Sequence, residues 1–292
     1  MKPERTSEMI NHQDSLQDLT IFIPVHNGMP YIELLLKSIL KEKVQWKIII
    51  SEDSSTDGTR QFLEELDDSR ITILYSNARL TLSENWSTGI NHANTKYVKL
   101  LCADDEFNIH FAAKSISLMK ENSEVIAVLG KSEIVSTTNL KHHKLSISSW
   151  PIFGNIPCRV ARFMILLSGR NIFGSPSNII FRTEFLKSVM PWSDQHPYMI
   201  DVATYLKLFN SFPNHAIYSS KDFSSMFRLR PGSITSQNYE THLNQWKSVL
   251  LRELQDMVLW KRVPLQFIGI CLAMLNNVIR KKTLEKAGMK PK

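Results

Sequence analysis

The stretch that decides the fold begins with Leu19-Thr-Ile-Phe-Ile-Pro-Val25, a continuous run of apolar and β-branched residues. Such a run is typical of a strand buried on both faces, and the polar residues His26-Asn27-Gly28 end it in a turn. Apolar residues at helical spacing follow over 31–40, with Pro30 at the start. A second buried strand is expected over 46–50. The chain therefore starts its ordered part as strand, helix, strand.

The same alternation continues to residue 105. An acidic, hydroxyl-rich turn over 51–59 leads into a helix that ends near residue 66, and strands over 71–75 and 97–101 enclose a helix over 83–94. Strands that alternate with helices at this spacing predict an α/β fold with a largely parallel sheet, in which ligands bind at the carboxyl ends of the strands. The polar turns after the first, second and fourth strands are thus the expected binding edge.

Length and composition place the rest of the chain around this unit. The 292 residues are 43% hydrophobic and 22% charged, which suffices for a full core and excludes collagenous, coiled-coil and disordered classes. We expect a flexible N-terminal arm over 1–18 and a ligand-binding half over 19–110. A more loosely patterned half over 111–240 shapes the substrate pocket, and a helical segment over 241–292 ends the chain. The tryptophans are dispersed, which favours core packing over a stacking surface for nucleic acid.

Charge and cysteine content bear on location. Lys and Arg number 35 against 28 Asp and Glu, a net charge of +7 that suits a polyanionic partner or serves solubility alone. Three widely spaced cysteines form no disulfide framework and indicate a reducing compartment. The polar first residues lack the apolar core of a secretion signal. These features predict a cytoplasmic protein.

The C-terminal segment contains an uncharged stretch over 263–279, about the lower limit for a membrane span and interrupted by Pro264 and polar residues. Lys261-Arg262 precede it and Arg280-Lys-Lys282 follow it. One interpretation is an amphipathic helix lying on an anionic inner leaflet, which would make the protein peripheral on the inner face of the plasma membrane. A helix packed on the protein, or at the seam of a homo-oligomer, explains the same residues.

Candidate chemistry lies in the carboxylates at the predicted strand ends. Asp53 follows the second strand and Asp104-Asp105 follow the fourth. Adjacent carboxylates suit a hard divalent cation such as Mn²⁺ or Mg²⁺, although acids at a helix N-terminus are also stabilised by the helix dipole. The glycines do not form a dinucleotide-binding loop. Gly169 to Gly174 has phosphate-loop spacing, but Ser-Pro follows where Lys-Ser/Thr is required.

Three motifs together resemble the family 2 glycosyltransferases: Thr20-Ile-Phe-Ile-Pro-Val-His-Asn27, Ile50-Ser-Glu-Asp-Ser-Ser-Thr-Asp-Gly-Thr59 and Tyr97-Val-Lys-Leu-Leu-Cys-Ala-Asp-Asp105. The resemblance extends over about residues 19–235. It implies the A-type glycosyltransferase fold, a Rossmann-like, mainly parallel sheet flanked by helices, here with a C-terminal helical extension. It also implies a nucleotide-diphosphate sugar donor and a divalent metal.

The resemblance assigns roles to residues of the first half. Asp53 would contact the nucleobase, and Asp104 and Asp105 would be the metal and ribose carboxylates. Residues implied to line the donor site are Pro24, Val25, His26, Asn27, Arg79, Asn85, Ala103 and Asp104. Arg79 could offer paired donors to a diphosphate, or be a solvated loop charge. Cys102 stands where many members have the first acid of an Asp-x-Asp motif, and Glu52 replaces a frequent Asp.

In the second half the resemblance implies a general base and a counter-charge. Asp201 aligns with the second acid of a Glu-Asp pair that opens a helix and supplies the base, and it also suits a helix cap. Asp194 is the reserve candidate. Arg228 and Arg230, before Gly-Ser, would close over the diphosphate, or they form a basic surface turn.

These implications predict an inverting glycosyltransferase. An acceptor hydroxyl would attack the anomeric carbon of a UDP- or dTDP-sugar, and the acceptor would be a glycan or a polyprenyl-linked intermediate of surface polysaccharide assembly. Two alternatives stay open. One is a metal-dependent nucleotidyltransferase, which would be expected to show a basic, glycine-rich triphosphate loop. The other is a sugar-nucleotide-binding partner protein that has lost its chemistry.

Overall fold

A computed structural model describes residues 16–138, 141–148, 152–169, 171–193, 195–229, 239–255 and 259–286. The first half alternates strands and helices as β1 (Leu19–Val25), α2 (Tyr31–Leu40), β2 (Lys47–Asp53), α3 (Thr59–Glu64), β3 (Ile71–Ser76), α4 (Leu82–His92) and β4 (Tyr97–Leu100). The predicted elements of this half are confirmed, with boundary shifts of a few residues. The last residues of the predicted arm already pack against the protein, since Leu16 is buried in the core. Residues 1–15 of the predicted arm lie outside the described residues.

The second half mixes short strands with helices. Its strands are β5 (Glu106–Phe107), β6 (Val125–Thr138), β7 (Lys141–Ser148), β8 (Gly154–Pro157), β9 (Ile179–Arg182) and β10 (Ala216–Leu229). Its helices are α5 (Ile109–Glu121), α6 (Cys158–Ser168), the 3₁₀ turn η1 (Pro176–Asn178), α7 (Thr183–Lys187), α8 (Ile200–Ser211), α9 (Tyr239–Glu253) and α10 (Leu259–Lys286). The last two helices form the expected C-terminal helical extension.

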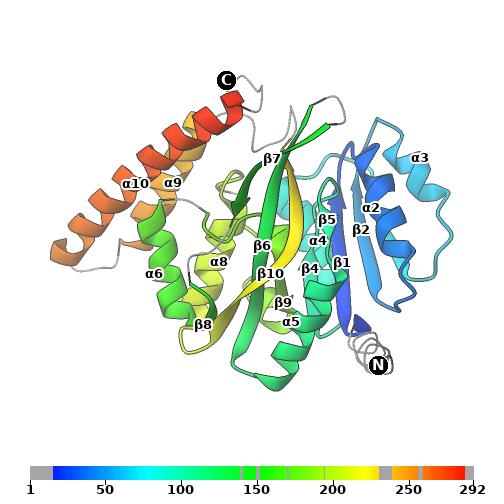
Figure 1. The fold of residues 1–292 in the computed structure, drawn as a ribbon, viewed down its shortest axis with the longest axis horizontal. Coiled ribbons are helices and arrows are strands. Elements are labelled where there is room, and N and C mark those ends of the chain that lie inside the picture. Colours follow the sequence, from blue (N-terminus) through cyan, green and yellow to red (C-terminus); the bar gives the residue numbers. More distant parts are fainter. Residues whose placement is uncertain are drawn as a thin grey trace, which may run out of the picture.

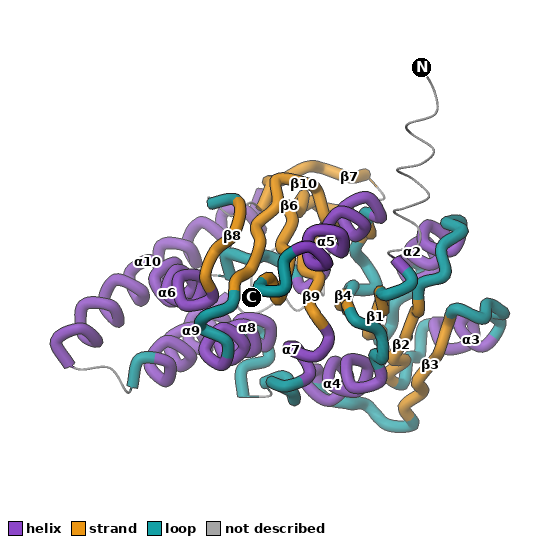
Figure 2. Tube along the Cα trace, turned by 90° about the horizontal axis from the view of Figure 1, so that it is seen from below, coloured by secondary structure: helices purple, strands orange, loops and turns teal. Residues whose placement is uncertain are grey.

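The described strands form one sheet in the order β3-β2-β1-β4-β9-β6-β10-β5, with β7 beside β6 and β8 beside β10. The strands β3, β2, β1 and β4 are parallel, as predicted. Beyond β4 the sheet is mixed, since β9 runs antiparallel to both β4 and β6, whereas β6 and β10 are parallel. The sheet lies between helix layers, with α2 and α5 on one face and α4, α7 and α8 on the other (Figures 1 and 2).

Burial on both faces explains the apolar run of β1. Ile21 and Ile23 belong to the core cluster shared with α2, whereas Phe22 points to the opposite cluster with Trp86. On that side Gly89 of α4 lies so close to the Phe22 ring that an added Cβ would stand 1.8 Å from a ring atom. The two clusters pack on opposite faces of β1. The turns that follow the parallel strands lie at one edge of the sheet.

Candidate active site

The turns after β1 and β2 are joined by a hydrogen-bond network. The backbone N–H groups of Asn27, Gly28 and Met29 donate to Ser55 Oγ, Thr59 Oγ1 and Asp57 Oδ2, each at 2.9 Å. Thr56 returns a backbone N–H to Asn27 Oδ1 at 2.8 Å. Asn27 itself has φ 51°, a left-handed conformation that asparagine tolerates. The Pro24-Val25-His26-Asn27 turn is therefore held in one conformation by the turn that carries Asp53.

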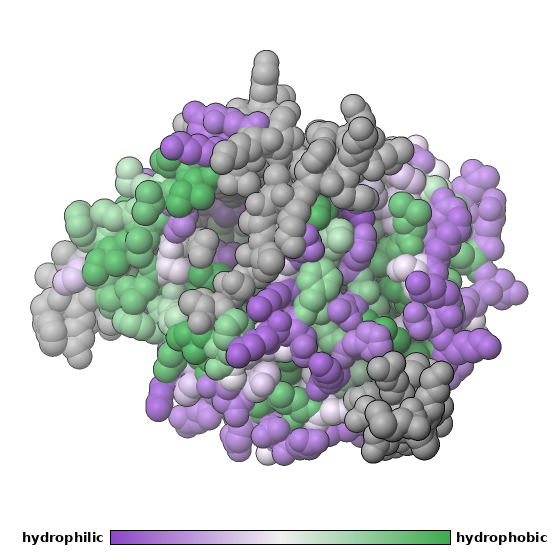
Figure 3. All heavy atoms as spheres, viewed as in Figure 1, coloured by the Kyte–Doolittle hydropathy of each residue, from purple (hydrophilic) through white to green (hydrophobic). Residues whose placement is uncertain are grey.

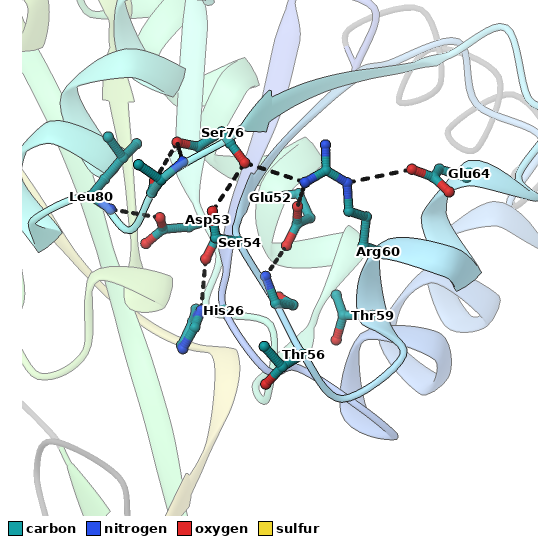
Figure 4. Close-up of polar contacts among 12 residues, drawn as sticks. His26, Glu52, Asp53, Ser54, Thr56, Thr59, Arg60, Glu64, Ser76 and Leu80 are labelled. Atoms are coloured by element: carbon teal, nitrogen blue, oxygen red, sulfur yellow. Dashed lines mark hydrogen bonds and ion pairs between the residues drawn. The ribbon is translucent and has the colours of Figure 1, made fainter.

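Asp53 lies at the end of β2 with no exposed surface. Its Oδ1 accepts the Leu80 N–H at 2.8 Å, its Oδ2 is 3.5 Å from Asn85 Nδ2, and it forms an ion pair with Arg79. His26 Nδ1 is 2.7 Å from the Asp53 carbonyl oxygen (Figure 4). Burial, followed by the charge of Arg79, lowers the pKa of His26, so its ring is neutral at physiological pH. The structure brings together these four predicted donor-site residues.

Glu52, which replaces a frequent Asp, supports the same turn from behind. Its side chain is buried, and Oε1 accepts the Ser55 N–H at 2.6 Å. Arg60 Nη1 stands 3.8 Å from its other oxygen (Figure 4). The longer side chain is thus used to hold the loop that borders Asp53.

The Asp104-Asp105 turn follows β4, and its two carboxylates differ in burial. Asp105 is 2% exposed, with Oδ1 accepting the Arg228 N–H at 3.2 Å and Oδ2 accepting the Ser175 hydroxyl at 3.1 Å. Burial and the adjacent Asp104 raise the pKa of Asp105 to about 7. Asp104 is less buried and lines a cavity of about 470 Å³ together with Asp105, Tyr31 and Arg228. The predicted carboxylate pair is placed beside this cavity.

Arg228 is buried near the end of β10 and braces this turn. Its Nε donates to the Asp104 carbonyl oxygen at 3.0 Å, its Nη2 to Glu106 Oε1 at 3.2 Å, and its guanidinium lies 5.2 Å from the centre of the Tyr31 ring. Arg228 is therefore buried against the Asp104-Asp105 turn and is not exposed in a basic surface turn. Arg230, the second predicted counter-charge, lies outside the described residues.

Asp201 lies in the first turn of α8. Its Oδ1 accepts the Val202 N–H at 2.7 Å and its Oδ2 accepts Asn171 Nδ2 at 2.6 Å. The N-cap position belongs to Met199, so Asp201 is not the capping residue. Burial raises the pKa of Asp201 to about 6. A carboxylate with this pKa is deprotonated at neutral pH yet basic enough to accept a proton. The reserve candidate, Asp194, lies outside the described residues.

A short segment, residues 171–175, connects the two carboxylate groups. Asn171 donates its amide hydrogens to Asp201 Oδ2 and to the Gly174 carbonyl at 2.7 Å, and Ser175 bonds Asp105. Asp201 and Asp105, far apart in the sequence, are thus held by residues four positions apart. The sequence alone did not point to Asn171, because a single asparagine in an irregular loop carries no periodic signal.

The donors at the Asp104-Asp105 turn fit a hard divalent cation. No group of three or more His, Cys, Asp or Glu side chains forms a complete ligand set within the described ranges. Mg²⁺ or Mn²⁺ commonly takes one or two carboxylates and completes its coordination with substrate phosphates and water. Burial, followed by the charges of Asp105 and Asp104, raises the pKa of the neighbouring Cys102 thiol. The two aspartates beside the cavity therefore suit a cation that arrives with a phosphate.

Comparison with known proteins establishes the family. Residues 20–190 match the model of glycosyl transferase family 2. The chain belongs to this family, and it has the fold of the A-type glycosyltransferases.

Individual relatives match a smaller part. The UDP-Glc:alpha-D-GlcNAc-diphosphoundecaprenol beta-1,3-glucosyltransferase WfgD of Escherichia coli is 25% identical over 123 residues, 42% of this chain and 48% of that protein. The GalNAc(5)-diNAcBac-PP-undecaprenol beta-1,3-glucosyltransferase of Campylobacter jejuni is 30% identical over 126 residues, 42% of this chain and 40% of that protein. The chain thus spans less than half the length of these relatives.

Solved structures share the fold at low identity. Staphylococcus aureus TarS 1-349 in complex with UDP-GlcNAc superposes with a TM-score of 0.64 and 17% identity, covering 90% of this chain and 72% of TarS 1-349. The mannosyltransferase PcManGT of Pyrobaculum calidifontis, in complex with GDP-Man and Mn²⁺, gives 0.59 and 17%, covering 92% and 73%. At this identity the likeness concerns the fold.

Proposed function

We propose that the chain is an inverting glycosyltransferase that moves a sugar from a UDP- or dTDP-sugar to a glycan or lipid-linked acceptor in surface polysaccharide biosynthesis. The observation that carries the proposal is the segment 171–175, which holds the candidate base Asp201 and the candidate metal carboxylate Asp105 on one side of the binding edge. Family membership supports the reaction class. The names of the two relatives, both of which act on diphosphoundecaprenol or PP-undecaprenol substrates, support a lipid-linked acceptor.

The donor would bind across the ends of β1, β2 and β4. Asp53 can accept the imide N–H of a uracil or thymine ring beside the His26 turn. The Arg79 side chain is 56% exposed while it pairs with Asp53, so its guanidinium can turn to a diphosphate that occupies the edge. The diphosphate would then reach Asp104 and Arg228. A divalent cation held by Asp104 and Asp105 would supply Lewis-acid stabilisation of the departing diphosphate.

The transfer step assigns one task to Asp201. Its carboxylate accepts the proton of the acceptor hydroxyl, whose oxygen forms a bond to the anomeric carbon of the donor sugar. The bond from that carbon to the diphosphate oxygen breaks on the opposite face, and its electron pair leaves with the nucleoside diphosphate. The Asn171 amide keeps one carboxylate oxygen in place, so the other faces a fixed direction. A base of this kind contributes roughly 10²–10⁴-fold to the rate.

The C-terminal helix would attach the enzyme to anionic lipid. No described helix is both long and apolar enough to cross a membrane. The helix α10 packs on α6 and α9, and Asn276 Nδ2 donates to the Ser168 carbonyl at 2.8 Å. Its outer face exposes the large apolar side chains Phe267, Ile268, Met274, Leu275, Val278 and Ile279.

Apolar side chains gather in one area over α10 and α6 (Figure 3), and the exposed Lys281 and Lys282 follow the apolar face along α10. An apolar face with cations at its end matches the boundary of an anionic leaflet. We therefore place the protein in the cytoplasm, peripheral on the inner face of the plasma membrane.

Sedimentation with vesicles tests the attachment. The wild type should sediment with vesicles that contain phosphatidylglycerol more than with neutral vesicles, and a Phe267→Ser, Leu275→Ser variant should lose most of this binding. Leu34→Ser on α2, which removes an exposed leucine far from α10, is the matched control. Self-association through this face would instead appear as a dimer that the double variant abolishes, and that result would refute attachment to lipid.

Calorimetry with nucleotides tests the donor site. UDP, dTDP, GDP and CDP are titrated with and without Mn²⁺ into the wild type and an Asp104→Ala, Asp105→Ala variant. We expect metal-dependent binding of a uridine or thymidine diphosphate that the variant loses, followed by transfer from the matching sugar nucleotide. Binding without any transfer to polyprenyl-diphosphate-linked acceptors would favour a non-catalytic binding protein. Absence of binding by all four nucleotides would refute the proposal.

A further inference from the structure

A lysine is buried inside the central sheet. Lys99 belongs to β4 and has no exposed surface, between neighbours that pack in the core. Moving an ammonium group out of water costs several kcal/mol, and proteins usually compensate the charge with an adjacent carboxylate. Among the described residues, the hydrogen-bond partners of Lys99 are instead the Ser177 carbonyl oxygen and the Ser224 hydroxyl, 3.3 Å away. Because these hydrogen-bond partners are uncharged, a contribution to stability does not by itself explain why a lysine is buried here.

The two partners show what the amino group joins. The Ser224 hydroxyl donates to the Asn178 carbonyl at 3.1 Å, so toward Lys99 it is an acceptor. Ser177 and Asn178 form η1 with Pro176, and Ser224 lies on β10. The Lys99 amino group therefore ties β4 to η1 directly and to β10 through Ser224.

The segment that Lys99 holds is also the one that supports the metal carboxylates. The Ser175 hydroxyl donates to Asp105 Oδ2 at 3.1 Å, and the Ser177 hydroxyl accepts the Cys102 N–H at 3.0 Å. Lys99 is thus connected through residues 175–177 to Asp105 and to Cys102, which precedes the Asp104-Asp105 turn. The charge also fits this place, since the Asp105 carboxylate attracts the Lys99 ammonium and opposes the burial that lowers the pKa of Lys99 to about 7.

We propose that Lys99 is a positioning residue that holds the segment 175–178 against β4 and so keeps Asp105 in place for a phosphate-bound divalent cation. The role of a cation in this proposal rests on the proposed function. The anchoring of residues 175–178 by Lys99 does not depend on it. Residues that orient metal ligands from behind typically change metal affinity about 10–100-fold when they are replaced.

The test compares Lys99→Met, which keeps the length and removes the charge and both donated hydrogen bonds, with Lys114→Met. Lys114 is an exposed lysine on α5 that pairs with Asp222, 3.4 Å away. Hydrogen exchange measured by mass spectrometry should be about tenfold faster in a peptide spanning 171–178 of Lys99→Met, and unchanged in the 20–30 peptide and in the control. Calorimetry should show affinity for UDP with Mn²⁺ reduced about 10–100-fold and affinity for uridine alone unchanged.

The outcomes separate the two proposals. Normal exchange over 171–178 together with normal UDP-Mn²⁺ affinity in folded Lys99→Met overturns the role of Lys99. Equal losses of uridine and UDP-Mn²⁺ affinity also overturn it, because they indicate general disruption. If the wild type binds no nucleotide, the donor site is wrong and the exchange result alone decides whether Lys99 anchors the segment. If Lys99→Met does not fold, Ser224→Ala keeps the ammonium and removes one acceptor, and it should change exchange and affinity in the same direction by a smaller factor; no change overturns the proposal.

Discussion

The two ends of the binding edge surround their aspartates differently. At the proposed nucleobase end, Asp53 is paired with the Arg79 guanidinium and with a main-chain N–H. At the proposed transfer end, Asp105 and Asp201 accept hydrogen bonds from neutral amide and hydroxyl groups, and burial raises both pKa values, to about 7 and about 6. A carboxylate with a counter-charge suits recognition of a ligand, whereas carboxylates with raised pKa values suit proton transfer or a cation.

The two ends also differ in how the chain builds them. The nucleobase end joins neighbouring turns, and residues 26–29 bond residues 53–59. The transfer end joins residues far apart in sequence, since Arg228 is 123 positions from Asp105 and Ser175 is 70 positions from it. Single substitutions should therefore separate the functions of the two ends.

The largest effect is expected from Asp201→Asn. The amide keeps the shape of the side chain but cannot accept a proton, so transfer should fall about 10²–10⁴-fold while UDP affinity changes little. The control is Asp222→Asn, which alters a half-buried aspartate on β10, distant in sequence from Asp201, and should leave transfer unchanged. Full activity of Asp201→Asn would show that the base lies elsewhere.

A crossed pair of variants sharpens the contrast between the ends. Asp105→Asn should lower the affinity for UDP with Mn²⁺ about 10–100-fold and leave uridine binding intact. Asp53→Asn should weaken both uridine and UDP by a similar factor, with or without metal. Calorimetry on the same preparations measures all four affinities. Identical patterns from the two variants would contradict the division of labour.

The pH dependence of transfer follows from Asp201. Burial raises its pKa from 3.8 to about 6, and a base must be deprotonated. At saturating donor and Mn²⁺, kcat should fall about tenfold for each pH unit below 6 and be level above 7. Between about pH 4 and 6 the Asp201 carboxyl group is protonated in the folded state but deprotonated in the unfolded chain. Its contribution to the free energy of unfolding therefore decreases as the pH rises through that window. Thermal unfolding of wild type and Asp201→Asn should show the difference, and a kcat that stays constant down to pH 5 would refute the assignment.

The smallest effect concerns the nucleobase end. Thr81 is the N-cap residue of α4 and forms a capping box with Glu84. The Thr81 hydroxyl accepts the Glu84 backbone N–H, and the Glu84 carboxylate accepts the Thr81 backbone N–H. The backbone N–H of the preceding residue, Leu80, donates to Asp53 Oδ1. Thr81→Ala should lower the free energy of unfolding by about 1 kcal/mol and weaken uridine binding a few-fold, with the Mn²⁺ requirement unchanged. Thr88→Ala, on the same helix, is the control. A loss confined to metal-dependent binding would contradict the separation of the ends.

Much of the first half could be predicted because its signals are local. The run from Leu19 to Val25 is apolar at every position because both faces of β1 are covered, and a strand buried in this way is legible without its neighbours. The turn residues His26, Asn27 and Asp53 follow strand ends, so a parallel sheet alone is enough to bring them to one edge. The resemblance to the family pointed to Asp104 and Asp105 through its third motif, and to Asp201 through a separate segment of the second half.

The tertiary structure alone decided how those residues are connected. The antiparallel insertion of β9 between β4 and β6 carries η1 behind the Asp104-Asp105 turn, and no spacing in the sequence announces it. Long-range packing brings Asn171 and Ser175 into contact with Asp201 and Asp105, and Lys99 into contact with Ser177. Periodicity reports which side of an element is buried, but which distant side chain lies opposite a carboxylate depends on the whole sheet. The sequence by itself therefore determined the class of fold and the acids of the candidate site, and only folding determined which neutral donors hold those acids and how burial raises the pKa values of Asp105 and Asp201.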